Sequence, residues 1–193
     1  MKKNIAHIIT LTSLCIAILS IIQSCYFNFR IAASLIVISL ILDGIDGAIA
    51  RYLNTASEFG KQLDSLSDMI AFGLAPAILL YNFIGHELNN STLSYLTLFI
   101  PICSALRLAN YNNSRFSETF HGLTTPVSAL MFISIPLIKE YEQNAYILNI
   151  VMNESVIAST IVIISILLIS PLETFNLRID SIRYDKRKLF FIF

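Results

Sequence analysis

The chain has 193 residues, of which 55% are hydrophobic and only 13% are charged, and its mean hydropathy is +0.71. Soluble domains carry about 25% charged residues, so this composition excludes an ordinary soluble domain and indicates a single integral membrane domain. The formal net charge is zero, which gives no support for a nucleic-acid partner.

Six apolar segments follow one another along the chain, and each is interpreted as a membrane-spanning helix. They cover residues 6–23, 31–50, 66–85, 93–109, 123–138 and 155–171. A helix needs about 20 residues to cross an apolar core of about 30 Å, so several segments must include residues at the interfaces. Apolar and polar residues do not alternate, which argues against β-structure. The sequence therefore predicts an all-α, integral membrane bundle of six transmembrane helices in residues 1–171 and a basic cytoplasmic tail in residues 172–193.

Lysine and arginine are distributed unevenly between the two ends of these predicted helices. If the N-terminus is cytoplasmic, eleven of the thirteen basic residues fall on the cytoplasmic side, and only Arg30 and Lys139 fall outside. Cytoplasmic segments of membrane proteins carry such an excess of basic residues. We therefore expect both termini in the cytoplasm, with the acidic residues of the 41–70 stretch at the same face.

That stretch, ILDGIDGAIARYLNTASEFGKQLDSLSDMI, contains four aspartates between the second and third apolar segments. Asp43 and Asp46 are spaced to share one helical face, and Asp64 and Asp68 share a face of the next helix. The loop between the helices is short, so the helices are antiparallel neighbours whose carboxylates can meet. Carboxylates this close repel each other. A divalent cation that prefers oxygen ligands, such as Mg²⁺, Mn²⁺ or Ca²⁺, would remove the repulsion.

Small residues accompany the aspartates on the same helical faces. Gly47, Ala50 and Gly60 leave room for a ligand, or they serve only close packing of helices. A bound metal beside an open slot suits phosphoryl-transfer chemistry. Two alternatives remain open: the acids cap helices and pair with Arg51 and Lys61, or they line the cation path of an ion-coupled transporter. Such transporters usually carry paired repeats, and we find no repeat in the sequence.

The complete pattern D-x2-D-G-x2-A-R-x8-G-x3-D-x3-D resembles the signature of the CDP-alcohol phosphotransferase family. All eight defining positions match at the right spacing, namely Asp43, Asp46, Gly47, Ala50, Arg51, Gly60, Asp64 and Asp68. Three further segments resemble the phosphatidylserine synthase branch of that family: LDSLSDMIAFGLAPA, CSALRLANYN and FHGLTTPVSA. The resemblance covers about residues 5 to 170 and leaves only the tail outside it.

The resemblance implies transfer of a phosphatidyl group from CDP-diacylglycerol to an alcohol, which is L-serine in this branch, with release of CMP. It implies a site that binds Mg²⁺ or Mn²⁺, with Ca²⁺ as a further possibility, through Asp43, Asp46, Asp64 and Asp68. Asp64 and Asp68 would be catalytic, and Asp68 would take the proton of the serine hydroxyl. The implied CDP-binding residues are Asp43, Asp46, Gly47, Ala50, Arg51 and Gly60. The resemblance also implies a homodimer in the lipid membrane, which we expect to be a bacterial inner membrane, and no nucleic-acid partner.

Recognition of the acceptor is expected to involve the basic residues Arg107 and Arg115. Arg107 lies in the CSALRLANYN segment, where a guanidinium can bind a carboxylate or a phosphate. Asn110 stands where the branch usually has arginine, so Arg107 is expected to bind the acceptor without that second arginine. Thr124 stands where proline is usual, and Ala71 where serine is usual. Glycerol 3-phosphate or inositol phosphate remains an alternative acceptor, and His7 is expected only at the interface.

Overall fold

The computed structural model describes residues 2–52, 57–113 and 122–170, and side chains within them except those of residues 2–6 and 50–52. These residues form helices and turns. In chain order the elements are α1 (Lys2–Cys25), α2 (Phe29–Tyr52), α3 (Glu58–Asp68), η1 (Met69–Leu74), α4 (Ala75–Glu87), α5 (Ser91–Ser94), η2 (Tyr95–Leu98), α6 (Phe99–Asn113), α7 (Thr125–Tyr141), α8 (Ala145–Val151) and α9 (Glu154–Ile169). The predicted all-α class is confirmed for the described residues.

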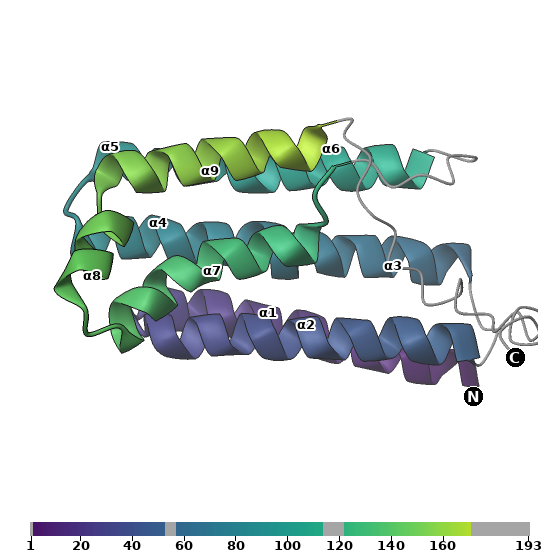
Figure 1. The fold of residues 1–193 in the computed structure, drawn as a ribbon. Helices are drawn as coiled ribbons and strands as arrows, with labels where there is room; N and C mark the ends of the chain where they lie inside the picture. The colour runs from purple at the N-terminus through teal and green to yellow at the C-terminus, as the bar shows by residue number, and fades with distance from the viewer. Residues whose placement is uncertain (1, 53–56, 114–121, 171–193) are drawn as a thin grey trace, which may run out of the picture.

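The long helices run side by side along one direction, as Figure 1 shows. Four helical stretches are long and apolar enough to cross a membrane: His7–Cys25, Phe29–Ile49, Glu58–Glu87 and Ser91–Asn112. The pair α8 and α9 passes the same test together but is bent by 55°, which gives five candidate spans in the described parts of the chain. The predicted count of six is not confirmed, because α7 has only 17 residues.

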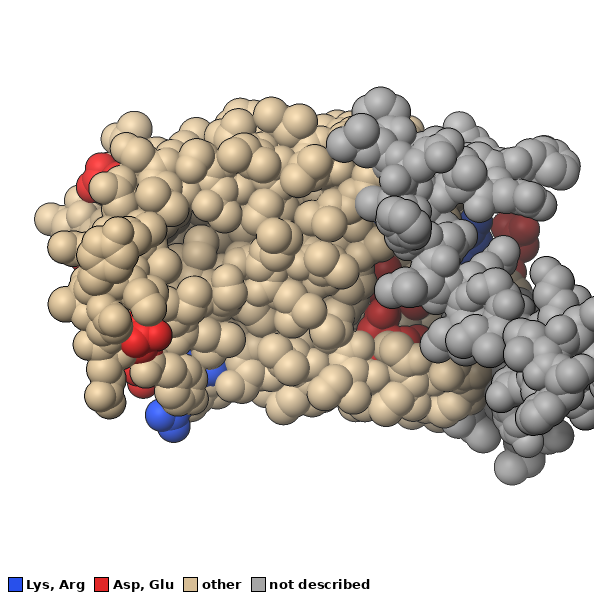
Figure 2. Space-filling view, in the orientation of Figure 1, with Lys and Arg blue, Asp and Glu red and all other residues tan. Residues whose placement is uncertain are grey.

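Charged side chains lie at the two ends of this bundle. We call the end at which α2 ends and α3 begins the site end, and the other the far end. On the face shown in Figure 2, charged residues appear near both ends and uncharged residues fill the belt between them. At the far end, the Lys139 ammonium lies 3.0 Å from Glu87 and the Arg30 guanidinium lies 3.9 Å from Glu140. This distribution suits a helical bundle inserted in a bilayer.

Small hydroxyl residues hold α1 against α2. The Ser13 and Ser39 hydroxyls lie 2.8 Å apart, and each also donates to the backbone carbonyl of the other residue, at 2.9 and 3.1 Å. Nearer the far end, the Ser20 hydroxyl donates to the carbonyl of Ala32 at 2.7 Å. Small side chains let the two backbones approach closely, and their hydroxyls pair across the contact within the apolar medium. These bonds fix the register between α1 and α2, and α2 carries the first two aspartates.

The third span contains an irregular turn directly after Asp68. Residues Met69–Leu74 form a π-helix, in which the N–H of Ala75 donates to the carbonyl of Ile70 five residues earlier. Pro76 has no N–H for the carbonyl four residues before it, and its ring crowds that carbonyl, which gives a physical reason for the widened turn. Gly73 within the turn lies against Ser104 of α6, where an added Cβ would come within 3.1 Å of the Ser104 Cβ. The turn therefore brings the Asp68 helix close to α6.

The segment before α7 is attached to the end of α9. Gly122 has a φ of +74°, and the N–H of Leu123 donates to the carbonyl of Leu167 at 3.0 Å. A Cβ at Gly122 would lie 2.8 Å from the Leu168 carbonyl oxygen and 2.9 Å from that of Leu167. Only glycine adopts this backbone conformation at this approach without strain. The attachment fixes the start of α7, where Thr125 is fully buried.

We predict that Gly122→Ala destabilises the protein by about 1–3 kcal/mol, because it adds both an unfavourable φ and a clash with two backbone carbonyls. Thermal unfolding in detergent should show a lower Tm than the wild type. Gly85→Ala is the matched control, since its Cβ would meet only the Ser94 hydroxyl at 3.6 Å and alanine favours a helix. An equal Tm loss in both variants would contradict this account of Gly122.

Candidate functional site

Three of the four aspartates meet at the site end of the bundle. One carboxylate oxygen from each of Asp43, Asp64 and Asp68 lies within 4.8 Å of the others. Asp43 comes from α2, whereas Asp64 and Asp68 come from successive turns of α3, which begins at its N-cap Ser57. The Ser57 hydroxyl accepts the N–H of Gly60 at 3.1 Å, so the helix starts nearly two turns before Asp64. The helical spacing predicted that the four carboxylates meet, and the structure brings three of them together.

Asp46 lies beside this group but outside the set that converges within 4.8 Å. Its side chain is only 3% exposed, and it acts electrostatically on Asp43, Asp64 and Asp68. The Thr10 side chain of α1 hydrogen-bonds to the Asp46 carboxylate, whereas the buried Asp46 Oδ2 has no partner among the described residues. A buried carboxylate oxygen without a partner is costly, so this position requires a further donor or a cation.

These residues fit a divalent metal ion. Asp43 and Asp68 hydrogen-bond to each other, which two carboxylates can do only when they share a proton. The buried Asp68 Oδ1, like Asp46 Oδ2, has no partner among the described residues. Mutual repulsion and unpaired carboxylate oxygens are both relieved by a hard cation with oxygen ligands. The donor set alone does not distinguish Mg²⁺ from Mn²⁺ or Ca²⁺.

The small residues of the motif have different surroundings. Among the described residues, Gly47 has open space where a side chain would begin, with no atom within 4 Å of an added Cβ. Gly60 is packed instead, because an added Cβ would lie 2.9 Å from His7 Cε1, and the His7 ring also contacts Phe59 edge to face at 5.5 Å. The room expected beside Gly60 is thus occupied by His7, and the CDP-binding roles of Gly47 and Gly60 stay predictions. The side chains of Ala50 and Arg51 lie outside the described residues.

Arg107 approaches the aspartates from the opposite side, on α6. Its Nη1 lies 3.5 Å from the Thr125 hydroxyl at the start of α7, and its charge interacts with Asp68. The buried Nε of Arg107 has no partner among the described residues. A carboxylate and a guanidinium with unpaired polar atoms thus face the same region. The second predicted acceptor residue, Arg115, lies outside the described part of the chain.

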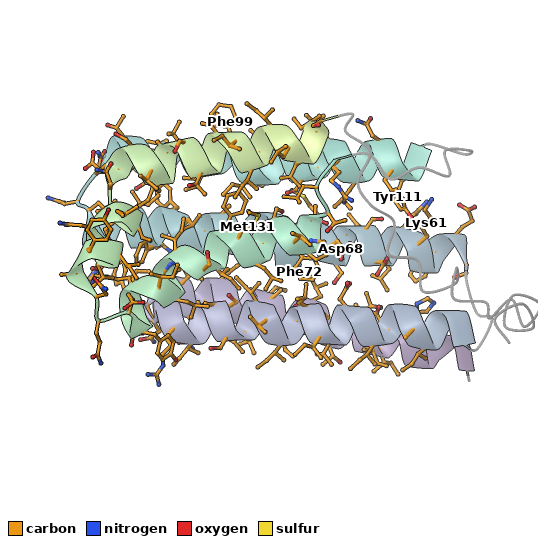
Figure 3. The ribbon with its side chains drawn as sticks, in the orientation of Figure 1. Lys61, Asp68, Phe72, Phe99, Tyr111 and Met131 are labelled. Atoms are coloured by element: carbon orange, nitrogen blue, oxygen red, sulfur yellow. The ribbon has the colours of Figure 1, made fainter. Side chains whose placement is uncertain are left out.

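Side chains nearer the end of the bundle join α6 to α3. The Lys61 ammonium lies over the Tyr111 ring, 5.6 Å from its centroid, and the Asn112 amide donates to the Ser65 hydroxyl at 2.8 Å. Figure 3 shows Lys61 and Tyr111 closer to the end of the bundle than Asp68. Asp68 therefore lies at the inner side of the site, and these contacts fix α6, with Arg107, relative to α3.

Three residues at the site carried no functional prediction from the sequence: Thr10, His7 and Thr125. The sequence does contain a signal for Thr10. Small residues repeat at coiled-coil spacing within an apolar segment, at Thr10, Ser13, Ala17, Ser20 and Ser24. That repeat predicts the face of α1 that packs on α2, and hence a residue near Asp46. The contact of His7 with Gly60 and that of Thr125 with Arg107 join distant segments, so no local pattern indicates them.

Comparison with known families matches residues 3–172 to the family described as CDP-alcohol phosphatidyltransferase. A CDP-diacylglycerol–serine O-phosphatidyltransferase of Helicobacter pylori (strain ATCC 700392 / 26695) is 33% identical over 175 residues, which cover 89% of this chain and 72% of that protein. The protein of the same name from Methanocaldococcus jannaschii is 38% identical over 74% of this chain and 68% of its own length. The one from Bacillus subtilis is 32% identical over 65% and 71%.

The match to the family extends from α1 to just beyond α9 and includes every aspartate of the cluster. The family generally depends on a divalent metal, which agrees with the acidic cluster at the site end. The chain belongs to the CDP-alcohol phosphatidyltransferase family.

Proposed function

We propose that this protein transfers the phosphatidyl group of CDP-diacylglycerol to the hydroxyl of L-serine, giving phosphatidylserine and CMP. The names of the relatives from three organisms support this reaction. The observation that carries the proposal is the convergence of Asp43, Asp64 and Asp68 within 4.8 Å. Arg107 interacts with Asp68 from the other side. A metal-binding carboxylate cluster and an anion-binding guanidinium are the two parts that a diphosphate donor and an amino-acid acceptor require.

We assign metal binding to Asp43, Asp46, Asp64 and Asp68, with Mg²⁺ or Mn²⁺ as the ion. When bound, the ion would neutralise the diphosphate charge and make CMP a better leaving group. The carboxylates hold their positions because α1 packs against both α2 and α3. Asp46 contributes Oδ2, a buried oxygen that has no partner among the described residues.

Asp68 is assigned as the general base. One of its oxygens is engaged with Asp43, and the other, Oδ1, is buried without a described partner. The two oxygens of one carboxylate can therefore serve different tasks. In the reaction the serine oxygen attacks the phosphorus that bears the diacylglycerol, the phosphoanhydride bond to CMP breaks, and Asp68 accepts the hydroxyl proton. Asp64, one turn away on α3, is the second catalytic carboxylate.

Arg107 is assigned to the carboxylate of serine. Its Nη1 contact with Thr125 holds the guanidinium in place, and its Nε remains without a described partner. A guanidinium binds a carboxylate through two parallel hydrogen bonds, which orients the acceptor as well as attracting it. We keep Arg115 as a second acceptor contact. We also keep Gly47, Ala50, Arg51 and Gly60, with Asp43 and Asp46, as the CDP-binding set.

The bundle has six transmembrane helices in this proposal, with α7 and α9 completing the set. The 17 residues of α7 span about 25 Å at 1.5 Å per residue, so interfacial residues must complete its crossing. The excess of basic residues supports a cytoplasmic location for the site end, both termini and the tail of residues 172–193. The lipid chains of the donor then stay in the bilayer while its head group reaches the aspartates. A homodimer in a bacterial inner membrane completes the proposal.

A transporter is the alternative from another class. Its cation site would be expected near mid-membrane between interrupted helices, whereas these aspartates lie in the site-end halves of the spans Phe29–Ile49 and Glu58–Glu87. Glycerol 3-phosphate or inositol phosphate is the alternative acceptor, and the names of the relatives favour serine over both.

The reaction is tested with purified protein, CDP-diacylglycerol and labelled serine, with Mg²⁺ or Mn²⁺ present or removed by chelation. We expect CMP release and labelled phosphatidylserine only when both serine and the divalent ion are present. Glycerol 3-phosphate and inositol phosphate serve as competing acceptors in parallel assays. Use of either in place of serine would overturn the acceptor, and absence of metal-dependent CMP release would overturn the enzyme assignment.

Asp68→Asn should lower kcat by about 10²- to 10⁴-fold, because the amide cannot accept the hydroxyl proton. Binding of CDP-diacylglycerol, measured by equilibrium dialysis, should stay within a few-fold of the wild type. Glu154→Gln is the control, since Glu154 lies at the far end and accepts a hydrogen bond from Asn90 that glutamine can also accept. Turnover by Asp68→Asn at the wild-type rate would exclude Asp68 as the base.

Arg107→Ala should raise the KM for serine by about 10- to 100-fold, the loss expected for one charged hydrogen-bond pair, with a smaller effect on the KM for the lipid. Arg107→Lys should recover only part of this loss, because lysine lacks the planar fork. Arg30→Ala removes an exposed arginine at the far end and should leave both constants unchanged. An unchanged serine KM in Arg107→Ala would remove the proposed contact.

A further inference from the structure

Thr10 of α1 contacts both halves of the aspartate site. Its side chain is only 5% exposed and hydrogen-bonds to the carboxylate of Asp46 on α2. Its backbone carbonyl accepts the hydroxyl of Ser67 on α3 at 3.5 Å. Ser67 is 2% exposed and directly precedes Asp68 in the chain. One residue of the first helix is therefore linked to both helices that carry the aspartates.

The antiparallel packing of α1 and α2 explains why Thr10 reaches Asp46. The Ser13–Ser39 pair fixes the register, so Thr10 lies one turn nearer the site end than Ser13. Helical side chains lean toward the N-terminus of their own helix. In an antiparallel pair, Thr10 leans toward the site end and Asp46 leans back from it, so the two side chains approach each other.

We propose that Thr10 is a positioning residue for the metal site: its hydroxyl holds the Asp46 carboxylate so that Oδ2 is presented to the divalent cation. The inference rests on the proposed function, because it takes Asp46 as a metal ligand. Asp46 Oδ2 is buried and has no described partner, so the bond from Thr10 fixes the group without satisfying that oxygen. Partners that orient a ligating carboxylate typically change metal affinity 10- to 100-fold when they are removed.

If Thr10 had a purely structural role, loss of its hydroxyl would lower the stability of the metal-free protein. The α1–α2 contact is already held by the two hydroxyls of the Ser13–Ser39 pair and by the bond from Ser20 to Ala32. Loss of the Thr10 hydroxyl should therefore leave the helix packing intact. Its effect should appear in metal binding and not in the stability of the metal-free protein.

The experiment measures Mn²⁺ affinity by electron paramagnetic resonance and the Tm of the metal-free protein, both in detergent and without substrates. Thr10→Val keeps the shape of threonine and removes the hydroxyl, whereas Thr10→Ser keeps the hydroxyl. Thr12→Val is the matched control, because Thr12 lies on the exposed side of the same helix and donates only to the carbonyl of Ile8. Asp46→Asn, with and without Thr10→Val, completes a double-mutant cycle.

We expect Thr10→Val to weaken Mn²⁺ binding by about tenfold or more, with a metal-free Tm close to the wild type. Thr10→Ser and Thr12→Val should bind as the wild type does. In the Asp46→Asn background, Thr10→Val should add no further loss. If Thr10→Val does not fold, Thr10→Ala takes its place in the same comparison.

Wild-type Mn²⁺ affinity in Thr10→Val would overturn the inference. So would a Thr10→Ser variant as weak as Thr10→Val, since the hydroxyl would then not be the relevant group. A full additive loss in the Asp46→Asn background would also overturn it, because Thr10 would then act independently of Asp46. Failure of the wild type itself to bind Mn²⁺ or to release CMP would instead contradict the proposed function.

Discussion

The electrostatic repulsion among closely spaced carboxylates is the constraint on which the arrangement of this protein depends. Asp43, Asp64 and Asp68 converge within 4.8 Å at the end of an apolar bundle, with Asp46 buried beside them. Such a group is stable only with shared protons or a cation. The helices around it hold the carboxylates in place: hydroxyl pairs hold α1 against α2, α1 also packs against α3, and α6 brings the Arg107 guanidinium.

Much of this arrangement follows from local rules that can be applied to the sequence. Helical periodicity places Asp43 with Asp46 and Asp64 with Asp68, and a short loop requires their helices to be antiparallel. Four of the six predicted spans coincide with helical stretches long and apolar enough to cross a membrane, because a bilayer demands long apolar runs. The predicted count of six spans is not confirmed, since α7 is short and the pair α8 and α9 is bent by 55°. Length and composition alone do not decide how such helices cross.

Other parts of the site depend on contacts between segments that are distant in the sequence. The packing of His7 against Gly60 and the bond between Arg107 and Thr125 arise only when the bundle is assembled. The motif suggested open space beside both glycines, yet only Gly47 has it. A glycine in the sequence indicates space beside the backbone, but the sequence does not show whether another side chain fills that space. The family resemblance, which the comparisons confirm, identified the reaction class without determining these contacts.

The π-turn after Asp68 sets the rotational phase of the third span. A π-turn holds one more residue than an α-helical turn, and each residue advances an α-helix by about 100°. The extra residue in Met69–Leu74 therefore rotates the side chains of α4 relative to those of α3, although the two helices form one continuous span. One face presents Asp64 and Asp68 to the aspartate cluster, and the other packs Leu80, Phe83 and Ile84 into the core. A regular helix of the same composition would have to misdirect one of these two sets.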